Sequence, residues 1–184
     1  MRLALLRTLA CAAALVAAAP AGAADAAFAV PTERAEALLR GHALAGADGR
    51  TFRLGELGTS VTVVNFWASW CAPCRRELPR LAALDRELRA SGGRVVAISI
   101  DEERANAERF LRRTAPTLGV AFDGPEALAQ DLDLRNVPCT IVLDRSGKVA
   151  WVTSRSDDAA LAELAAVARR VAAGRELAAE GAGR

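Results

Sequence analysis

The feature that most constrains the fold of this chain is the pair Cys71 and Cys74, which lies where two different hydrophobic patterns meet. Before the pair, residues 61–67 form a continuous apolar run of the kind found in buried strands. After it, residues 73–90 carry leucines at helical spacing. A Cys-x-x-Cys pair at a strand-to-helix junction holds two thiols within bonding distance at a helix N-terminus, which suits thiol–disulfide exchange.

The cysteine spacing alone leaves two other interpretations open. Such a pair also serves as a structural disulfide or as half of a zinc site. A tetrahedral zinc site needs two further ligands, and His42 with Cys139 makes a poor set. We therefore interpret the pair as redox-active, and we expect no metal and no bound cofactor.

The segments around the pair predict an α/β fold with a central mixed sheet flanked by helices. A second apolar run at residues 95–100 follows the helical segment, so strand, helix and strand form a right-handed parallel βαβ unit. Residues 43–54 carry Asp48-Gly49 between short runs, which is typical of a hairpin and adds an N-terminal extension to the sheet. The other expected elements are a helix at 32–40 capped by Thr32, a helix at 102–113, a strand at 120–122, a short helix at 125–130 beginning at Pro125, strands at 139–143 and 148–152, and a final helix capped by Ser156.

The first 23 residues have the pattern of a secretory signal peptide. Arg2 and Arg7 precede an apolar segment at residues 8–19, and small residues follow up to Ala23. The apolar segment is shorter than the ~20 residues that a membrane span needs. We expect cleavage near Ala23, export to the periplasm or another exported location, and a flexible stretch at residues 24–31.

Composition excludes several classes of protein. Loss of the signal peptide removes two arginines and leaves 22 basic and 22 acidic residues, so the exported chain is formally neutral. It has no dense basic stripe interleaved with aromatic residues, and nucleic-acid binding is not indicated. About 160 residues can bury a core without disulfide support, and three remaining cysteines are too few for a disulfide framework. No helix suited to dimerisation stands out, so we expect a monomer.

The stretch from Asn65 to Pro79, NFWASWCAPCRRELP, resembles the TlpA/ResA-like branch of secreted thiol-disulfide oxidoreductases, which have the thioredoxin fold. The resemblance continues through residues 137–144 and covers most of residues 43–172. It implies a thioredoxin-like domain at residues 43–174, between an N-terminal segment at 24–42 and a flexible tail at 175–184.

The resemblance implies that Cys71 is an exposed attacking thiol and that Cys74 is the buried resolving thiol. The position at a helix start agrees, because cysteines there have pKa values lowered to ~3.5–7.5. Asn65 stands where ordinary thioredoxins have a buried Asp that handles the proton of the second cysteine. Glu77 resembles the acid that TlpA/ResA-like proteins use instead, since it follows Cys74 on the same helix face. The alternative is an ordinary Glu that the helix dipole favours.

The dipeptide Val137-Pro138 resembles the cis-proline of the family, which lies against the two sulfur atoms, keeps metals away and leaves the preceding backbone free to pair with a substrate. The alternative is a trans proline at the start of an edge strand. The expected substrate contacts are Trp70, which neighbours the attacking thiol, together with Ala72, Pro73 and Val137.

The positions of two further residues can also be predicted. Trp67 lies in the strand and is expected in the core. Cys139 departs from the family pattern, in which Thr or Glu is more usual after the cis-proline. A third thiol beside the pair would either form an off-pathway disulfide or behave as a small buried hydrophobe, and we favour the second interpretation.

These residues predict an exported reductant of disulfides in protein substrates, for example in the maturation of cytochrome c or of copper sites. Its expected electron donor is a membrane thiol transporter. A dithiol oxidase or isomerase remains the alternative, because direction depends on reduction potential, although the short connection from Ile100 to Val120 leaves no room for the helical insertion typical of such oxidases. A non-catalytic metallo-assembly chaperone is disfavoured, because His42 is the only histidine and Met1 leaves with the signal peptide.

Overall fold

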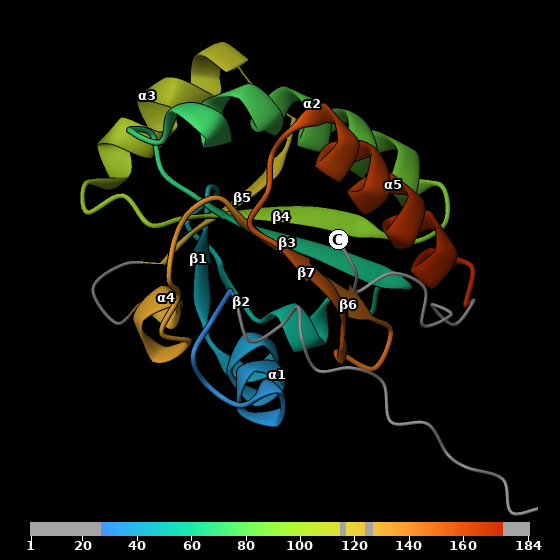
Figure 1. Ribbon diagram of the computed structural model, residues 1–184. Coiled ribbons are helices and arrows are strands. Elements are labelled where there is room, and N and C mark those ends of the chain that lie inside the picture. Colours follow the sequence, from blue (N-terminus) through green and yellow to red (C-terminus); the bar gives the residue numbers. More distant parts are fainter. Residues whose placement is uncertain (1–26, 115–116, 124–126, 175–184) are drawn as a thin grey trace, which may run out of the picture.

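A mixed β-sheet runs through the middle of the molecule, with helices on both of its faces (Figure 1). The computed structural model describes residues 27–114, 117–123 and 127–174. Within these residues, seven strands are ordered β2-β1-β5-β4-β3-β6-β7. The strands are β1 (Leu44–Gly46), β2 (Thr51–Phe52), β3 (Val61–Trp67), β4 (Arg94–Ser99), β5 (Gly119–Phe122), β6 (Cys139–Asp144) and β7 (Val149–Thr153). The helices are α1 (Thr32–Gly41), the 3-10 helix η2 (Leu54–Glu56), α2 (Ala72–Arg89), α3 (Arg104–Thr114), α4 (Leu128–Asp131) and α5 (Asp158–Ala172).

Strand β3 joins two differently directed parts of the sheet. It pairs parallel with β4 and antiparallel with β6, and every one of its residues is buried. Because α2 connects β3 to β4, these elements form the predicted βαβ unit. Strand β5 extends the parallel part, and the β1–β2 hairpin pairs antiparallel with β5 at the sheet edge. The predicted α/β class, mixed sheet and N-terminal hairpin are confirmed.

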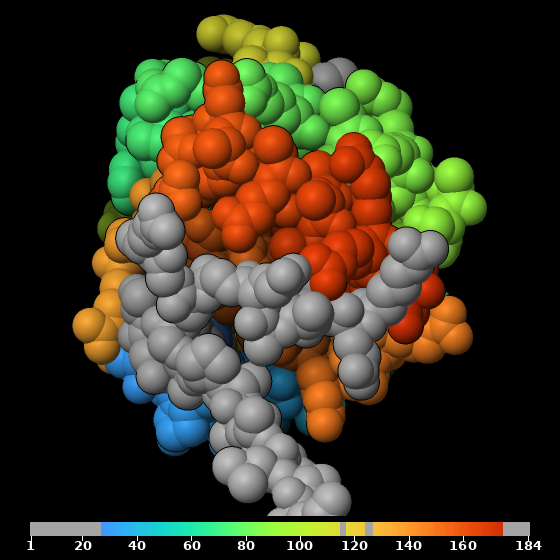
Figure 2. Space-filling view, turned by 45° about the vertical axis from the view of Figure 1, so that its right-hand side comes forward, coloured from blue at the N-terminus to red at the C-terminus, as the bar shows by residue number. Residues whose placement is uncertain are grey.

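Side chains along β3 alternate between the two faces of the sheet, and each face has its own core. Val63 and Trp67 pack with α2, α3 and α5, whereas Val64 and Phe66 pack with α1 and α4. Figure 2 shows one part of this packing from outside, where α5 crosses the front of the molecule beside α2. Asn65 has the same parity as Val63, so its side chain lies beneath α2.

Helix α2 carries the cysteine pair at its start and is tied to the sheet at its end. Cys71 is the N-cap residue, and its Sγ accepts a hydrogen bond from the Cys74 backbone N–H. Leu78 and three further leucines of α2 are buried, as the helical spacing predicts. Near the other end, the buried carboxylate of Asp85 accepts the Val95 backbone N–H at 2.8 Å, which joins α2 to β4.

Two predicted helix caps are wrong by one residue. The final helix begins after Asp157, whose carboxylate accepts the Ala160 N–H at 2.9 Å, and not after Ser156. Both residues are good caps, but the extended backbone that a cap requires is found at Asp157. In α1, Thr32 is the first helical residue, and Pro31 takes the cap position without a side-chain hydrogen bond.

The short helix α4 begins later than the sequence predicts. Pro125 lies outside the described residues, and the helix runs from Leu128 to Asp131. The buried carboxylate of Asp123 accepts the backbone N–H groups of Leu128 at 2.6 Å and Ala129 at 2.8 Å. A side chain five residues upstream therefore supplies the cap.

The start of the described chain is buried, although a flexible stretch was predicted at residues 24–31. Phe28 is 1% exposed and forms an isolated antiparallel bridge with Leu134. Beside this bridge, the Arg135 backbone N–H donates to the carbonyl oxygen of Ala27 at 3.2 Å. Burial of the large apolar side chain of Phe28 is favourable, and this side chain packs in the core around α1 and α4.

Two predictions fall on residues outside those described. These are the signal peptide at residues 1–23 and the flexible tail at residues 175–184. In the part of the chain that the structure describes, no helix combines the length and the apolar character needed to cross a membrane.

Candidate active site

Cys71 and Cys74 form a disulfide at the N-terminus of α2, with a Cα–Cα distance of 5.3 Å. Cys74 is fully buried and Cys71 is 4% exposed. The predicted exposure of Cys71 is therefore not found in the disulfide form, where Cys71 is almost fully buried. Cys71 is still the more accessible of the two cysteines. The segment before β6 covers part of the Cys71 side chain, because the Val137 carbonyl oxygen lies 3.7 Å from Cys71 Sγ.

That segment contains a cis peptide bond between Val137 and Pro138. Pro138 is buried, and the next residue, Cys139, begins β6 and pairs with Phe66 of β3. Pairing of β6 with β3 places the cis-proline beside the end of β3, where the cysteine loop starts. Residues far apart in the sequence thus meet at the disulfide.

A buried carboxylate anchors the loop that leads into Cys71. Asp101 accepts hydrogen bonds from the Ser69 backbone N–H at 2.9 Å, the Ser69 hydroxyl at 2.6 Å and the Ser99 hydroxyl at 2.8 Å. These contacts join the ends of the adjacent parallel strands β3 and β4. Trp70, the next residue in the loop, is 67% exposed and is the one large apolar side chain that is exposed among the described residues. Asp101 was not predicted from the sequence, although an acidic residue directly after a buried apolar run could have indicated it.

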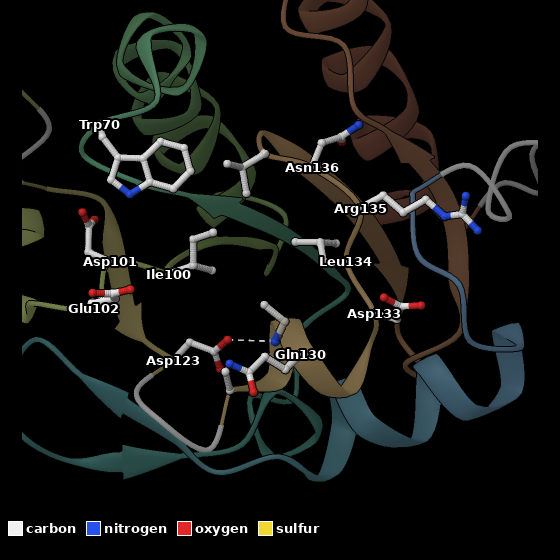
Figure 3. A pocket seen from close by; sticks show the side chains of 13 residues that line it. Trp70, Ile100, Asp101, Glu102, Asp123, Gln130, Asp133, Leu134, Arg135 and Asn136 are labelled. Carbon is white, nitrogen blue, oxygen red and sulfur yellow. Dashed lines mark hydrogen bonds between the residues drawn. The ribbon is translucent and has the colours of Figure 1, made fainter.

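A cavity of about 860 Å³ opens beside Trp70 (Figure 3). Its wall contains the apolar side chains of Ile100 and Leu134 as well as Val137, so the cavity reaches the cis-proline segment. Burial raises the pKa of Asp123, and hydrogen bonds from the start of α4 oppose this rise. The carboxylates in the cavity wall belong to Asp101, Glu102, Asp123 and Asp133. The cavity thus adjoins both the Trp70 loop and the cis-proline segment, and its lining combines apolar side chains with carboxylates.

Glu77 lies on the buried side of the same helix, one turn after Cys74, and is 1% exposed. Its Oε1 accepts a hydrogen bond from Asn65 Nδ2 at 2.8 Å. Burial raises the pKa of Glu77 from 4.5 to about 7, and the hydrogen bond from Asn65 partly opposes this rise. A carboxyl group with such a pKa is suited to exchange protons near neutral pH.

Cys139 is fully buried and is a free thiol. It packs in the core on the α1 and α4 face of the sheet, whereas Cys71 and Cys74 belong to the core on the opposite face. Burial, and to a lesser degree the charge of Glu77, raise the pKa of Cys139 to about 12. These observations agree with a small hydrophobe and not with a thiol that joins the exchange.

The remaining sequence candidates divide between surface and core. Ala72 is exposed and Pro73 is half-buried in the first turn of α2, beside the disulfide. Trp67 is fully buried, as expected, and contacts the ring of Phe110. Among the residues that the structure describes, no three His, Cys, Asp or Glu side chains are grouped in a way that could hold a metal ion.

Residues 18–167 match the model of the Redoxin family, which is most of the chain. The chain belongs to the Redoxin family. Its TlpA/ResA-like character, predicted from the cysteine motif, is confirmed by its relatives. The thiol-disulfide oxidoreductase ResA of Geobacillus thermodenitrificans is 29% identical over 106 residues, 58% of this chain and 61% of that protein. ResA of Bacillus subtilis is 25% identical over 111 residues, 60% and 62% of the two chains. The match therefore spans less than two thirds of these curated relatives.

Solved structures confirm the predicted thioredoxin-like fold. A Chlorobium tepidum structure described as the thiol:disulfide interchange protein DsbE is 29% identical, with a TM-score of 0.67 over 71% of this chain and 92% of that one. The thioredoxin domain of a thiol-disulfide oxidoreductase from Bacteroides vulgatus gives a TM-score of 0.61 at 16% identity, over 69% and 92% of the two chains. The second likeness concerns the fold alone.

Proposed function

We propose that this protein is an exported thiol-disulfide oxidoreductase that reduces disulfides in protein substrates through Cys71 and Cys74. The observation that carries the proposal is the Cys71–Cys74 disulfide at a helix N-terminus, with the cis Val137–Pro138 bond against it. The names of the relatives support the same class of reaction. An oxidising compartment outside the cytoplasm is part of the proposal, since the sequence predicts a signal peptide.

The reaction begins with both cysteines reduced. The Cys71 thiolate attacks one sulfur of the substrate disulfide, which forms a mixed disulfide and releases the other substrate sulfur as a thiolate. Cys74 then loses its proton to Glu77 and attacks Cys71 Sγ. This second exchange forms the Cys71–Cys74 disulfide and releases the second substrate thiol, so two electrons pass from the protein to the substrate.

Substrate binding is assigned to the surface around Trp70. The exposed indole offers a flat apolar contact next to the attacking sulfur, and Ala72 and Pro73 continue this surface. The backbone at Val137 lies beside Cys71 Sγ and is placed to pair with an extended substrate segment. The adjacent cavity would take side chains that flank the substrate cysteine.

The proposed direction is reduction, with electrons supplied by a membrane thiol transporter. Cysteines of proteins that later receive haem or copper are the substrates we propose. The connection between β4 and β5 contains α3 in its described part, and this agrees with the absence of the large helical insertion expected of dedicated oxidases.

The reduction potential of the Cys71–Cys74 pair tests the direction. The purified protein would be equilibrated with glutathione or dithiothreitol buffers of known ratio, and its thiols would be trapped and counted. A value near or below ~−270 mV supports a reductant, whereas a value near ~−120 mV would make the protein a disulfide donor.

Single-cysteine variants test the assignment of roles. Cys74→Ser should accumulate a mixed disulfide between Cys71 and a substrate, because the resolving thiol is absent. Cys71→Ser should form none, and Cys139→Ser should behave like the unmodified protein. A mixed disulfide through Cys74 or Cys139 would refute the proposed roles.

A further inference from the structure

A buried polar cluster links α2 to the sheet beneath it. Asn65, Glu77 and Thr140 are each 2% exposed or less. Asn65 Nδ2 donates to Glu77 Oε1 at 2.8 Å and to Thr140 Oγ1 at 2.9 Å, so both of its protons are engaged. Asn65 and Thr140 are direct partners in the antiparallel pairing of β3 with β6, and this register fixes the amide between the hydroxyl and the carboxylate.

The two oxygens of Glu77 differ in their surroundings. Oε1 is held by Asn65, whereas Oε2 is buried without a hydrogen-bond partner among the described residues. Asn65 Oδ1 is likewise buried without a partner there. A carboxylate with one oxygen held and the other unpartnered has a single oxygen available to accept a proton. Since a buried ionised group without partners is costly, the hydrogen bond to Oε1 also determines how readily Glu77 ionises.

We propose that Asn65, held in place by Thr140, is a positioning residue that orients Glu77 so that Oε2 accepts the proton of Cys74. This proposal rests on the function proposed above and extends it to residues outside the cysteine motif. The Asn65 amide donates its hydrogen bonds to Glu77 and Thr140, and in this proposal it acts through Glu77. Thr140 acts one step further away, because its hydroxyl oxygen engages the second proton of the amide.

Few other groups can set the ionisation of Glu77. Burial raises the pKa of Glu77, and the hydrogen bond from Asn65 lowers it. On the buried face of its own helix, the other titratable residues are Cys74, one turn before, and Asp85, two turns after, whose carboxylate is engaged by Arg89 and the Val95 N–H. On β6, the thiol of Cys139 senses the charge of Glu77. Helix α5, which packs on the same face of the sheet, buries only apolar side chains there. A change at Asn65 should therefore be felt directly by Glu77.

The substitution Asn65→Leu removes the donor and keeps the side chain near its original size. The ionised form of Glu77 then loses its one hydrogen bond, so its pKa should rise further, by one unit or more. One unit lowers the ionised fraction at neutral pH by up to tenfold. The second exchange step, in which Cys74 gives up its proton, should slow by the same factor, while the KM for substrate should not change.

The experiment measures both the ionisation and the reaction. Glutamate labelled with ¹³C at the carboxyl carbon gives the pKa of Glu77 by NMR titration, with Glu77→Gln used to assign the signal. Rapid-quench measurement of mixed-disulfide decay gives the pH profile of the second exchange step. In Asn65→Leu, the NMR pKa and the acid limb of the profile should move to higher pH together.

A second pair of variants keeps the test decisive where Asn65→Leu is too unstable to study. Thr140→Val should raise the pKa of Glu77 less than Asn65→Leu does, and Thr140→Ser should restore the original value because the hydroxyl remains. Thr62→Val is the matched control, since it removes a buried hydroxyl from β3 that bonds to Thr59 and not to Glu77.

The outcomes separate this proposal from the proposed function. Unchanged pKa values and pH profiles in Asn65→Leu and Thr140→Val, in a protein that still exchanges disulfides, would overturn the role of Asn65 and leave the function standing. A protein that forms no mixed disulfide at any pH would overturn the function itself. If Thr62→Val shifted the pKa of Glu77 as much as Thr140→Val does, the loss of any buried hydroxyl in these strands would explain the shift. That result would also refute the proposal.

Discussion

Replacement of Glu77 by Gln should remove a pH dependence from the stability of the oxidised protein. The native state raises the pKa of Glu77 from 4.5 to about 7, mainly through burial. The folded protein therefore binds this proton more tightly than the unfolded chain. Stability from this group is complete below about pH 4.5 and is lost as the pH rises through about 7. The pKa difference corresponds to about 3 kcal/mol.

Glutamine keeps the shape of the protonated acid and cannot ionise. Its Oε1 can still accept the hydrogen bond from Asn65. The two proteins should therefore unfold with similar free energies near pH 4, and Glu77→Gln should be more stable by about 3 kcal/mol above about pH 8. For a protein of this size, that difference raises the melting temperature by roughly 6–12 °C.

Urea unfolding of both oxidised proteins across this pH range provides the measurement. The difference between their free energies of unfolding cancels the contribution of other buried acids such as Asp123, whose pKa is also raised. Glu163→Gln, on the exposed side of α5, is the matched control for replacing a glutamate by glutamine away from the site. A flat difference for Glu77→Gln, or a loss of stability at alkaline pH, would refute the argument from burial.

The thiol of Cys139 should resist alkylation in the native protein, because it is fully buried with a pKa raised to about 12; mass spectrometry should find it modified only after denaturation, and rapid native labelling would contradict its burial. Trp70→Ala should change the free energy of unfolding by less than about 0.5 kcal/mol and should raise the KM for a protein substrate in a disulfide-reduction assay. An unchanged KM would remove Trp70 from the docking surface. Asp157→Ala should cost about 1 kcal/mol in urea unfolding, because the Ala160 N–H loses its cap, whereas Ser156→Ala should cost less; equal losses would argue against the observed cap.

The parts of the fold that sequence reasoning found are those whose signals are continuous along the chain. The apolar run of β3 and the leucine spacing of α2 each contain several residues that report the same element, and both were located to within about a residue. The meeting of these patterns at Cys71 was enough to place the disulfide at a helix start. The cis bond before Pro138 followed from family resemblance, since local sequence gives no such preference.

The parts that it missed depend on contacts between distant residues. Asp123 caps α4 across several intervening positions, and a cap of that kind has no local pattern. Phe28 looked like part of a flexible leader because its partner, Leu134, lies far along the chain. A cap at Ser156 or Asp157 could not be decided from residue type, because both side chains are good acceptors and the backbone makes the choice.

The candidate site shows the same division. Glu77 could be found from its spacing to Cys74, because both lie on one helix face. Thr140 could not be found, since its contact with Asn65 depends on the register between β3 and β6. The orientation of Cys139 follows once that register is known, because neighbouring residues in a strand point to opposite faces.

The bridge between Phe28 and Leu134 has a practical consequence for anyone who purifies this protein. A tag or fusion partner joined directly before residue 27 would be attached next to the Phe28–Leu134 bridge, which holds the segment leading to Pro138. Rates measured on differently tagged preparations would then report on the tag as well as on the enzyme. A tag beyond α5 is the safer choice, because α5 contributes no residue to the cavity beside Trp70.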